Sequence, residues 1–252
     1  MIGAIIGDVV GSRFEFNNTR DKTFKLFTAE SSFTDDTICT VAVADALLRK
    51  ADFATTLHDW CRKYPKPTGG YGCSFARWVN SDDYAPYYSF GNGAAMRVSP
   101  CAWAYDNASD VMRAAIASAD VTHNHPEGII GAMSTALAVR GLINAQSKDV
   151  VHSVLQLYYH DCKMSDFEQG KFDETCQGTV PLAMHIFLES TSFEDAIRRA
   201  VVWGGDSDTL AAIVGSLAEA YYGVPLDIEK RVMRFLDDDM KRVIKDFNTT
   251  FK

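Results

Sequence analysis

Two short acidic clusters, each ending in threonine, constrain the fold of this chain more than any other feature. The first spans residues 34–37 and reads Thr-Asp-Asp-Thr; the second spans residues 206–209 and reads Asp-Ser-Asp-Thr. Each runs into an alanine-rich apolar stretch, and Thr, Asp and Ser are residue types that cap helix N-termini. Free backbone N–H groups and the helix dipole favour carboxylates at that end. The clusters therefore predict two helix starts.

The pairing of the two clusters indicates more than capping. Aspartate oxygens and threonine hydroxyls are hard ligands, which suit Mg²⁺, Mn²⁺ or Ca²⁺ better than Zn²⁺. Four carboxylates brought together without cations would repel one another, and some would protonate. Either cluster alone is explained by the capping of its own helix. The pair favours a site for two divalent cations, and such a site requires the fold to bring two distant helix starts together.

Glycines recur every four residues near the N-terminus, at Gly3, Gly7 and Gly11. On a helix they form one stripe, along which a second helix can approach closely. Because glycine weakens a helix in water, we expect tight packing in the centre of the fold to compensate. A short strand through Ile5 and Ile6 is the alternative.

Helical signals dominate the remainder. We expect helices over 36–50, 54–64, 109–120, 128–146, 150–159 and 179–188. A capping box at Ser192 and Asp195 should open another helix, which Gly204–Gly205 ends. A helix from 208 is closed by Gly223 and Pro225, and Asp227 caps a final helix over 228–247. Residues 12–33 read as a loop and 66–99 as turn-rich. Strand-length alternation is scarce, and no repeat or linker is visible. The sequence predicts a single compact all-α, multi-helix domain over residues 1–252.

Composition narrows the partners and the compartment. The chain is 47% hydrophobic and 23% charged, which is typical of a globular protein. A net charge of −8 argues against a nucleic-acid backbone as the partner, so an anionic ligand needs local donors. Six cysteines without a Cys-x-x-Cys pair indicate reduced thiols. With no signal peptide and no run of about 18 apolar residues, we expect a cytoplasmic protein without a membrane partner. The pattern gives no oligomeric state.

Two further residues are candidates for chemistry. Glu15 stands between Phe14 and Phe16, and apolar neighbours would raise its pKa and suit it for acid–base work; a solvated surface glutamate is the alternative. His123 and His125 have a spacing that can chelate zinc. Because no cysteine or third histidine is near, a histidine that hydrogen-bonds a ligand or the backbone is favoured.

Glycine-rich turns offer a place for phosphate groups. Glycines at 69, 70, 72, 91 and 93 let backbone amides approach a ligand, and such concave turns bind anions. Tyr71, Tyr87, Tyr88 and Phe90 lie beside them in sequence, where a base could stack. The alternative is that these are ordinary loop glycines and core aromatics.

Five motifs in chain order carry a family resemblance: Gly3-x-x-x-Gly7-Asp8-x-x-Gly11, Phe33 to Thr37, Gly91 to Arg97, Thr122-His123, and Gly204 to Thr209. Together they resemble the ADP-ribosylglycohydrolase family, from residue 2 to about residue 225. The resemblance implies an all-helical domain with two Mg²⁺ or Mn²⁺ ions at its centre. It also implies hydrolysis of the bond that joins ADP-ribose to an acceptor.

The resemblance assigns roles by motif position. It implies cation ligation by Thr34, Asp35, Asp36, Asp206, Asp208 and Thr209. It implies substrate contacts from Tyr71, Gly72, Ser89, Phe90, Gly91, Asn92, Gly93, Met96 and His123. Glu15 matches a mobile-loop glutamate, and we hypothesise that Glu15 or Asp35 handles the proton in catalysis. Tyr88 departs from the family pattern, because some members carry a small residue there.

The leading interpretation is a metal-dependent hydrolase of the N- or O-glycosidic bond between ADP-ribose and an acceptor, which would reverse ADP-ribosylation. An arginine-linked protein is the first expected substrate, followed by a serine-linked protein or a small ADP-ribosyl compound. One alternative is a non-catalytic ADP-ribose-binding protein that keeps the fold. Another is a two-metal phosphoesterase that acts on a small nucleotide.

Overall fold

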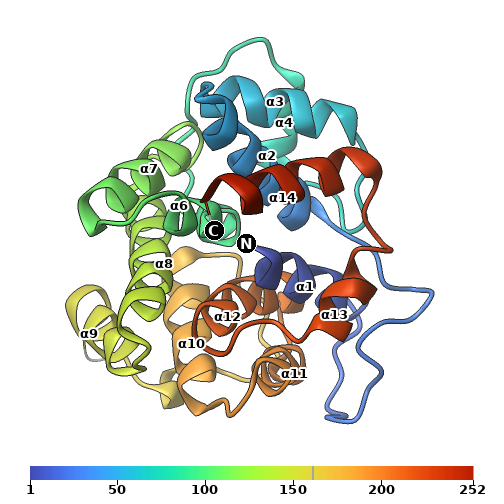
Figure 1. Cartoon of the computed structure of the whole chain (residues 1–252), viewed down its shortest axis with the longest axis vertical. Helices are drawn as coiled ribbons and strands as arrows, with labels where there is room; N and C mark the ends of the chain where they lie inside the picture. Colours follow the sequence, from blue (N-terminus) through green and yellow to red (C-terminus); the bar gives the residue numbers. More distant parts are fainter. Residues whose placement is uncertain (161, 252) are drawn as a thin grey trace.

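The fold is built from helices alone. The structure is a computed structural model, and it describes residues 1–160 and 162–251 (Figure 1). Across those residues there is no β-strand, and two isolated bridges join Thr34 to Thr68 and Gly91 to Thr175. The predicted all-α fold is confirmed. In chain order the helices are α1 (Ile2–Gly11), α2 (Asp35–Arg49), α3 (Phe53–Lys63), α4 (Cys73–Asn80), α5 (Gly93–Met96), α6 (Ser99–Ala104), α7 (Ala108–Asp120), α8 (Pro126–Ala145), α9 (Asp149–Tyr158), α10 (Cys176–Glu189), α11 (Phe193–Trp203), α12 (Ser207–Tyr222), α13 (Leu226–Val232) and α14 (Asp238–Phe251), with 3₁₀ turns η1 (Ser12–Phe14) and η2 (Met164–Asp166).

The glycine stripe places α1 against α12 in the middle of the molecule (Figure 1). A Cβ atom at Gly3 or Gly7 would overlap the backbone of Gly215 or Ala211 on α12. A Cβ at Gly11 would lie 2.5 Å from the Cα atom of Asp208. The helical prediction for this segment is confirmed and the strand alternative is wrong. The two backbones touch, and this contact fixes the start of α12 relative to the end of α1.

Replacing Gly7 with alanine should destabilise the protein strongly. Alanine would gain about 1 kcal/mol of helix propensity, but the overlap with Ala211 should cost more, for a net loss of about 2 kcal/mol or more. Urea unfolding followed by circular dichroism measures this change. Gly72→Ala is the control, because nothing lies within 4 Å of that position and its φ is −53°. Equal midpoints for Gly7→Ala and wild type would contradict the packing argument.

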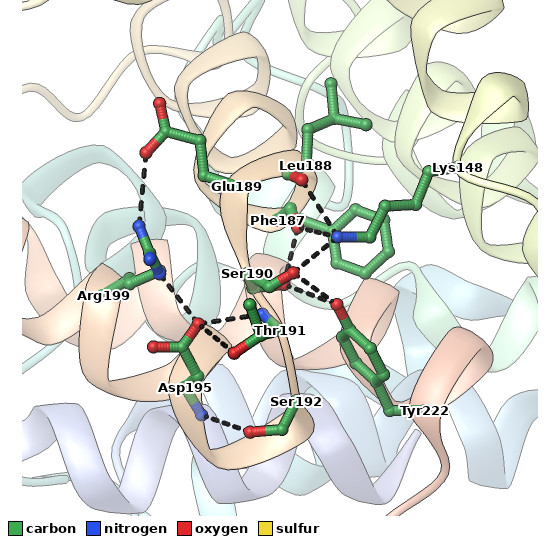
Figure 2. Close-up of polar contacts among 10 residues, drawn as sticks. All are labelled: Lys148, Phe187, Leu188, Glu189, Ser190, Thr191, Ser192, Asp195, Arg199 and Tyr222. Atoms are coloured by element: carbon green, nitrogen blue, oxygen red, sulfur yellow. Dashed lines mark hydrogen bonds and ion pairs between the residues drawn. The ribbon is translucent and has the colours of Figure 1, made fainter.

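Lys148 bonds the corner where the end of α10, the start of α11 and the end of α12 meet (Figure 2). The Nζ atom of Lys148 donates to the carbonyl oxygens of Phe187, Leu188 and Ser190, at 3.3, 2.9 and 2.6 Å. The Tyr222 hydroxyl, at the end of α12, also donates to the Ser190 carbonyl at 2.6 Å. These bonds satisfy carbonyl groups that the end of α10 leaves without helical partners.

Helix boundaries differ from the predictions in two regions. Residues 66–99 were expected to be turns but contain α4, α5 and the start of α6; α4 and α5 are short, and neither has a side-chain N-cap. The expected final helix over 228–247 is two helices. Asp227 does not cap the first of them, because it lies in the first turn of α13, whose N-cap is Pro225. Asp237 precedes the second, and its Oδ1 accepts from the Met240 amide at 2.9 Å. The Tyr64 hydroxyl also donates to Asp237, which ties this break to α3.

Helix α8 is both long and apolar. By length and composition alone it could cross a membrane, although no such segment was predicted. Half of it is buried, and it packs against α5, α7, α9, α10 and α12, as the core helix of a globular domain does. The apolar run in its sequence is interrupted by glycines, by Glu127 and by Arg140. The helix therefore contains no continuous run of about 18 apolar residues.

Candidate metal and ligand site

One cavity of about 510 Å³ collects nearly all the predicted site residues. Its wall includes the acidic residues Glu15, Asp35, Asp36, Glu174, Asp206 and Asp208, the glycines 69, 70, 72, 91 and 93, and Tyr71, Ser89, Asn92, Met96, Arg97, His123 and Thr209. Two predicted residues, Thr34 and Phe90, do not belong to the wall.

The two acidic helix starts meet, as the sequence predicted. The Thr209 hydroxyl at the start of α12 donates to Oδ2 of Asp36 at the start of α2, at 3.1 Å. Carboxylate oxygens of Glu15, Asp206 and Asp208 all lie within 4.8 Å of one another. Glu15 follows η1 directly, so the packing of α1 on α12 carries it to the cluster. Three segments far apart in sequence thus supply one acidic centre.

A buried aspartate beneath this centre holds α2 in place. Oδ2 of Asp8 on α1 accepts from the amides of Thr34 and Thr37, both at 3.0 Å, and from the Thr37 hydroxyl. Oδ1 of Asp8 accepts from the Thr34 hydroxyl at 2.8 Å. The Thr34 oxygen in turn accepts from the amide of Asp36 at 3.2 Å. Thr34 is therefore a helix cap bonded to Asp8 in this structure, behind the cavity wall and not on it.

The acidic centre favours protonation while no cation offsets its charge. Burial, opposed by the threonine hydrogen bonds, raises the pKa of Asp8 to about 6. Burial, together with the charges of Asp206, Asp8 and Glu174, raises the pKa of Glu15 to about 7. Burial is also the main cause of the raised pKa values of Asp35, Asp36, Asp206 and Asp208. Repulsion from neighbouring carboxylates adds to the raised pKa values of all four aspartates.

The oxygen atoms of the centre fit hard divalent cations. Oδ1 of Asp36 and Oδ1 of Asp208 are buried and have no hydrogen-bond partner among the described residues. A buried oxygen without a donor is costly, and a bound cation removes that cost. The nearby ligand set is made of carboxylates and a threonine hydroxyl, which suits Mg²⁺ or Mn²⁺. The sequence prediction of hard-cation chemistry is therefore compatible with the geometry.

The stabilising effect of Mg²⁺ should grow with pH. Without cations, the carboxyl groups with raised pKa values hold protons more tightly in the folded state than in the unfolded state. The free energy of unfolding of the metal-free protein therefore falls as pH rises through about 6, the pKa of Asp8, and about 7, the pKa of Glu15. Burial lowers the pKa values of His58 and His123, so these residues make the free energy of unfolding rise with pH. Their effect is the same with and without Mg²⁺ and cancels in the comparison. The Mg²⁺-induced rise in melting temperature should therefore increase from about pH 6 to about pH 8. Thermal unfolding with and without Mg²⁺ measures it, and a rise that shrinks over this range would contradict the acidic-centre assignment.

The loop 89–93 is tied to the acidic centre through Asn92. Its Nδ2 atom donates to Oδ2 of Asp206 at 2.7 Å and to the Thr179 hydroxyl at 3.1 Å. The backbone N–H of Asn92 donates to the backbone carbonyl oxygen of Glu174 at 2.7 Å. His123 lies against this loop, because a Cβ at Gly93 would be 3.1 Å from its Nε2 atom. The position of Asn92 thus couples the glycine loop to the aspartates.

The predicted aromatic contacts divide into two groups. The Tyr71 ring lines the cavity, and its hydroxyl donates to the carbonyl oxygens of Tyr64 and Cys61 at 2.8 and 3.2 Å. Phe90 is 45% exposed, and its ring lies 5.3 Å from that of His125, outside the wall. Tyr88, which departs from the family pattern, is exposed and has φ 58°, a conformation that a bulky side chain rarely adopts. His125 caps α8 by accepting from the amide of Glu127 at 3.1 Å.

Sequence reasoning missed several residues at the site. Asp8 and Arg97 fall within the motifs quoted above, but were given no role. Glu174 and Phe172 come from a loop with no helical or motif signal, so nothing in the sequence singles them out. The rings of Phe16 and Phe172 stack with centroids 6.0 Å apart and planes at 15°, beside Glu15 and Glu174 on the cavity wall.

Comparisons with known proteins agree on one family. The family model described as ADP-ribosylglycohydrolase matches residues 1–251. The chain is 27% identical to ADP-ribosylhydrolase ARH3 of Homo sapiens, over 89% of this chain and 84% of that protein. It is 26% identical to ADP-ribosyl-[dinitrogen reductase] glycohydrolase of Rhodospirillum rubrum, over 97% of this chain and 91% of that protein. A solved structure described as an ADP-ribosylglycohydrolase-related protein complex has a TM-score of 0.76 and 25% identity, over 100% of this chain and 96% of that chain.

Proposed function

Because this chain belongs to the ADP-ribosylglycohydrolase family, we propose that it is a metal-dependent enzyme that hydrolyses the glycosidic bond between ADP-ribose and an arginine side chain. The observation that carries the proposal is the meeting of Asp36 and Asp208 on one cavity, each with a buried oxygen that has no donor among residues 1–160 and 162–251. None of the aspartates expected at the centre is missing from the chain, which favours an enzyme over a non-catalytic ADP-ribose-binding protein.

The aspartates at the two helix starts are the proposed cation ligands. Asp35 and Asp36 would bind from α2, and Asp206, Asp208 and Thr209 from α12. Divalent cations bound there would orient ribose hydroxyls and a water molecule and lower the pKa of that water. Thr34 would support the site by holding the first turn of α2, through its bonds to Asp8 and to the Asp36 amide.

Glu15 is the proposed proton-transfer residue. A pKa of about 7 lets a carboxyl group both donate and accept a proton near neutral pH. Its Oε2 atom lies 2.6 Å from where a Cβ of Gly69 would be, so a side chain at position 69 would displace the carboxylate. Cleavage develops positive charge on the ribose ring, and the ionised carboxylates around the cavity would stabilise that charge.

The mouth of the cavity suits a cationic acceptor. Glu15 and Glu174 supply negative charge, and the stacked rings of Phe16 and Phe172 supply flat aromatic surface. A guanidinium group is planar, stays charged, and binds both carboxylates and aromatic faces. These features favour an arginine-linked substrate over a serine-linked one, whose acceptor carries no charge of its own.

Product analysis tests the proposal. The protein is incubated with arginine-linked and serine-linked ADP-ribosyl peptides, with Mg²⁺, with Mn²⁺ and after treatment with a chelator. We expect free ADP-ribose from the arginine-linked peptide, and only with a cation present. Release of a phosphate-bearing fragment smaller than ADP-ribose would identify a phosphoesterase instead. Release from the serine-linked peptide alone would overturn the acceptor assignment, and no release from either peptide would overturn the enzymatic proposal.

A further inference from the structure

Three side chains behind the glycine loop form a continuous hydrogen-bonded chain. The Nη2 atom of Arg97 donates to the carbonyl oxygen of Ser118 at 2.8 Å and to the Thr122 hydroxyl at 2.7 Å. The Thr122 hydroxyl lies 2.7 Å from Nδ1 of His123. All three residues are buried, with exposed fractions of 0%, 0% and 5%. Arg97 follows α5, whereas Thr122 and His123 follow α7, so the chain also joins two parts of the fold.

The donors and acceptors in this chain fix its direction. An arginine side chain only donates, so the Thr122 oxygen must accept from Arg97. A threonine hydroxyl has one proton to donate, and Nδ1 of His123 is its one side-chain partner other than Arg97 among the described residues. If His123 donated instead, the Thr122 proton would be buried without an acceptor, at a cost comparable to a lost hydrogen bond. The favoured direction runs from Arg97 through Thr122 to Nδ1.

This direction determines which nitrogen of His123 carries the proton. Burial and the charge of Arg97 lower the pKa of His123, so the ring is neutral and has a single N–H group. With Nδ1 accepting, that group is Nε2–H. Nε2 has no hydrogen-bond partner in the described part of the chain, and it faces Gly91 and Gly93, whose added Cβ atoms would lie 3.5 and 3.1 Å away.

The same region holds a buried cation, Arg97. No ion pair joins Arg97 to a carboxylate within the described residues, although its side chain is fully buried. A buried charge is costly until an opposite charge compensates it. Arg97 belongs to the cavity wall together with His123 and the glycine loop. An anionic ligand at the loop would supply the missing charge.

We propose that Arg97 and Thr122 are positioning residues that hold His123 as an Nε2–H donor to an anionic oxygen of a phosphate or diphosphate group bound at residues 91–93. Under the proposed function, this group is the diphosphate of ADP-ribose. The tautomer itself is a property of the free protein, so it can be tested independently of catalysis.

Nitrogen NMR tests the tautomer directly. In ¹⁵N-labelled protein without ligand, a long-range ¹H–¹⁵N spectrum distinguishes protonated from unprotonated ring nitrogens, and His123→Gln identifies the His123 signals. We expect a protonated Nε2 and an unprotonated Nδ1 in the wild type and in Thr122→Ser. In Thr122→Val, which has the same shape but no hydroxyl, the Nδ1–H form should appear. A wild type with protonated Nδ1, or a Thr122→Val spectrum identical to wild type, would overturn the proposal.

Calorimetric titration with ADP-ribose and with inorganic pyrophosphate tests the consequence. In the same Mg²⁺ buffer, Thr122→Val should bind both probes about 10- to 100-fold more weakly than Thr122→Ser. Thr135→Val is the matched control, because that buried hydroxyl on α8 has no hydrogen-bond partner among the described residues. Equal affinities for Thr122→Val and Thr122→Ser would overturn the ligand role. If ADP-ribosyl peptides stay intact while these two differences appear, the proposed function fails and this inference stands.

Discussion

Asp208→Asn should abolish both the stabilisation by Mg²⁺ and the hydrolysis of ADP-ribosyl substrates. Asp208 is buried at the start of α12 and has an oxygen atom with no hydrogen-bond donor among the described residues. Asparagine keeps the shape but loses the negative charge and one ligand oxygen. Cation-assisted charge stabilisation contributes several kcal/mol to a transition state, so turnover should fall by about a thousandfold or more.

The same substitution should leave the metal-free protein at least as stable as wild type. Burial and four neighbouring carboxylates, Asp206, Asp36, Glu15 and Asp8, raise the pKa of Asp208, so removing its charge relieves repulsion. Thermal unfolding with and without Mg²⁺ separates these effects from simple misfolding. Asp52→Asn is the control, because Asp52 is an exposed N-cap of α3 that asparagine can replace. A Mg²⁺ response of wild-type size in Asp208→Asn would contradict the proposed ligand role.

Glu15→Gln should lower kcat by about 10²- to 10⁴-fold, the range typical of a lost general acid or base. Glutamine fits the space beside Gly69 but cannot transfer a proton near neutral pH. Because Glu15 lies at the edge of the acidic centre and not at a helix start, affinity for ADP-ribose should change much less than kcat. Steady-state kinetics, together with titration of ADP-ribose, gives both quantities.

Glu174→Gln is the matched comparison for Glu15. It removes one negative charge from the same cavity wall, so equal losses of kcat in both variants would mean that charge alone matters. The pH profile adds a second criterion, since the acidic limb of the wild-type profile should disappear in Glu15→Gln. With cations bound, that limb should lie below pH 7, because they offset the neighbouring charges that raise the pKa of Glu15. If the limb persists, Asp35 is the better candidate for proton transfer.

The sequence predicts most of the frame because its signals are local. Caps such as Thr34 and Ser192 and the closing Gly223 mark helix ends within one or two residues. The glycine spacing predicts α1 as a packed helix, and the twin acidic clusters predict that two helix starts meet in one acidic centre. Four of the six cysteines are buried, and Cys73 is exposed.

What the sequence could not predict depends on contacts between distant segments. Glu174 and Phe172 gain their places from the path of the loop between η2 and α10, which no local rule describes. Asp8 reads as one polar residue in an apolar helix until its bonds to Thr34 and Thr37 are visible. The Thr34 side chain was predicted as a ligand from its motif, but whether a hydroxyl points at a cavity or at a neighbouring carboxylate depends on tertiary packing.

The contact between α1 and α12 has a consequence for genetics. Gly11 touches the backbone of Asp208, and Asp8 on the same helix holds the first turn of α2. A mutational screen scored by enzyme output would therefore flag the glycines of α1 as strongly as the aspartates, although no glycine performs chemistry. Measuring the abundance of each variant alongside its output would separate the two classes, since the glycine variants should lose protein and variants of Asp36 and Asp208 should not.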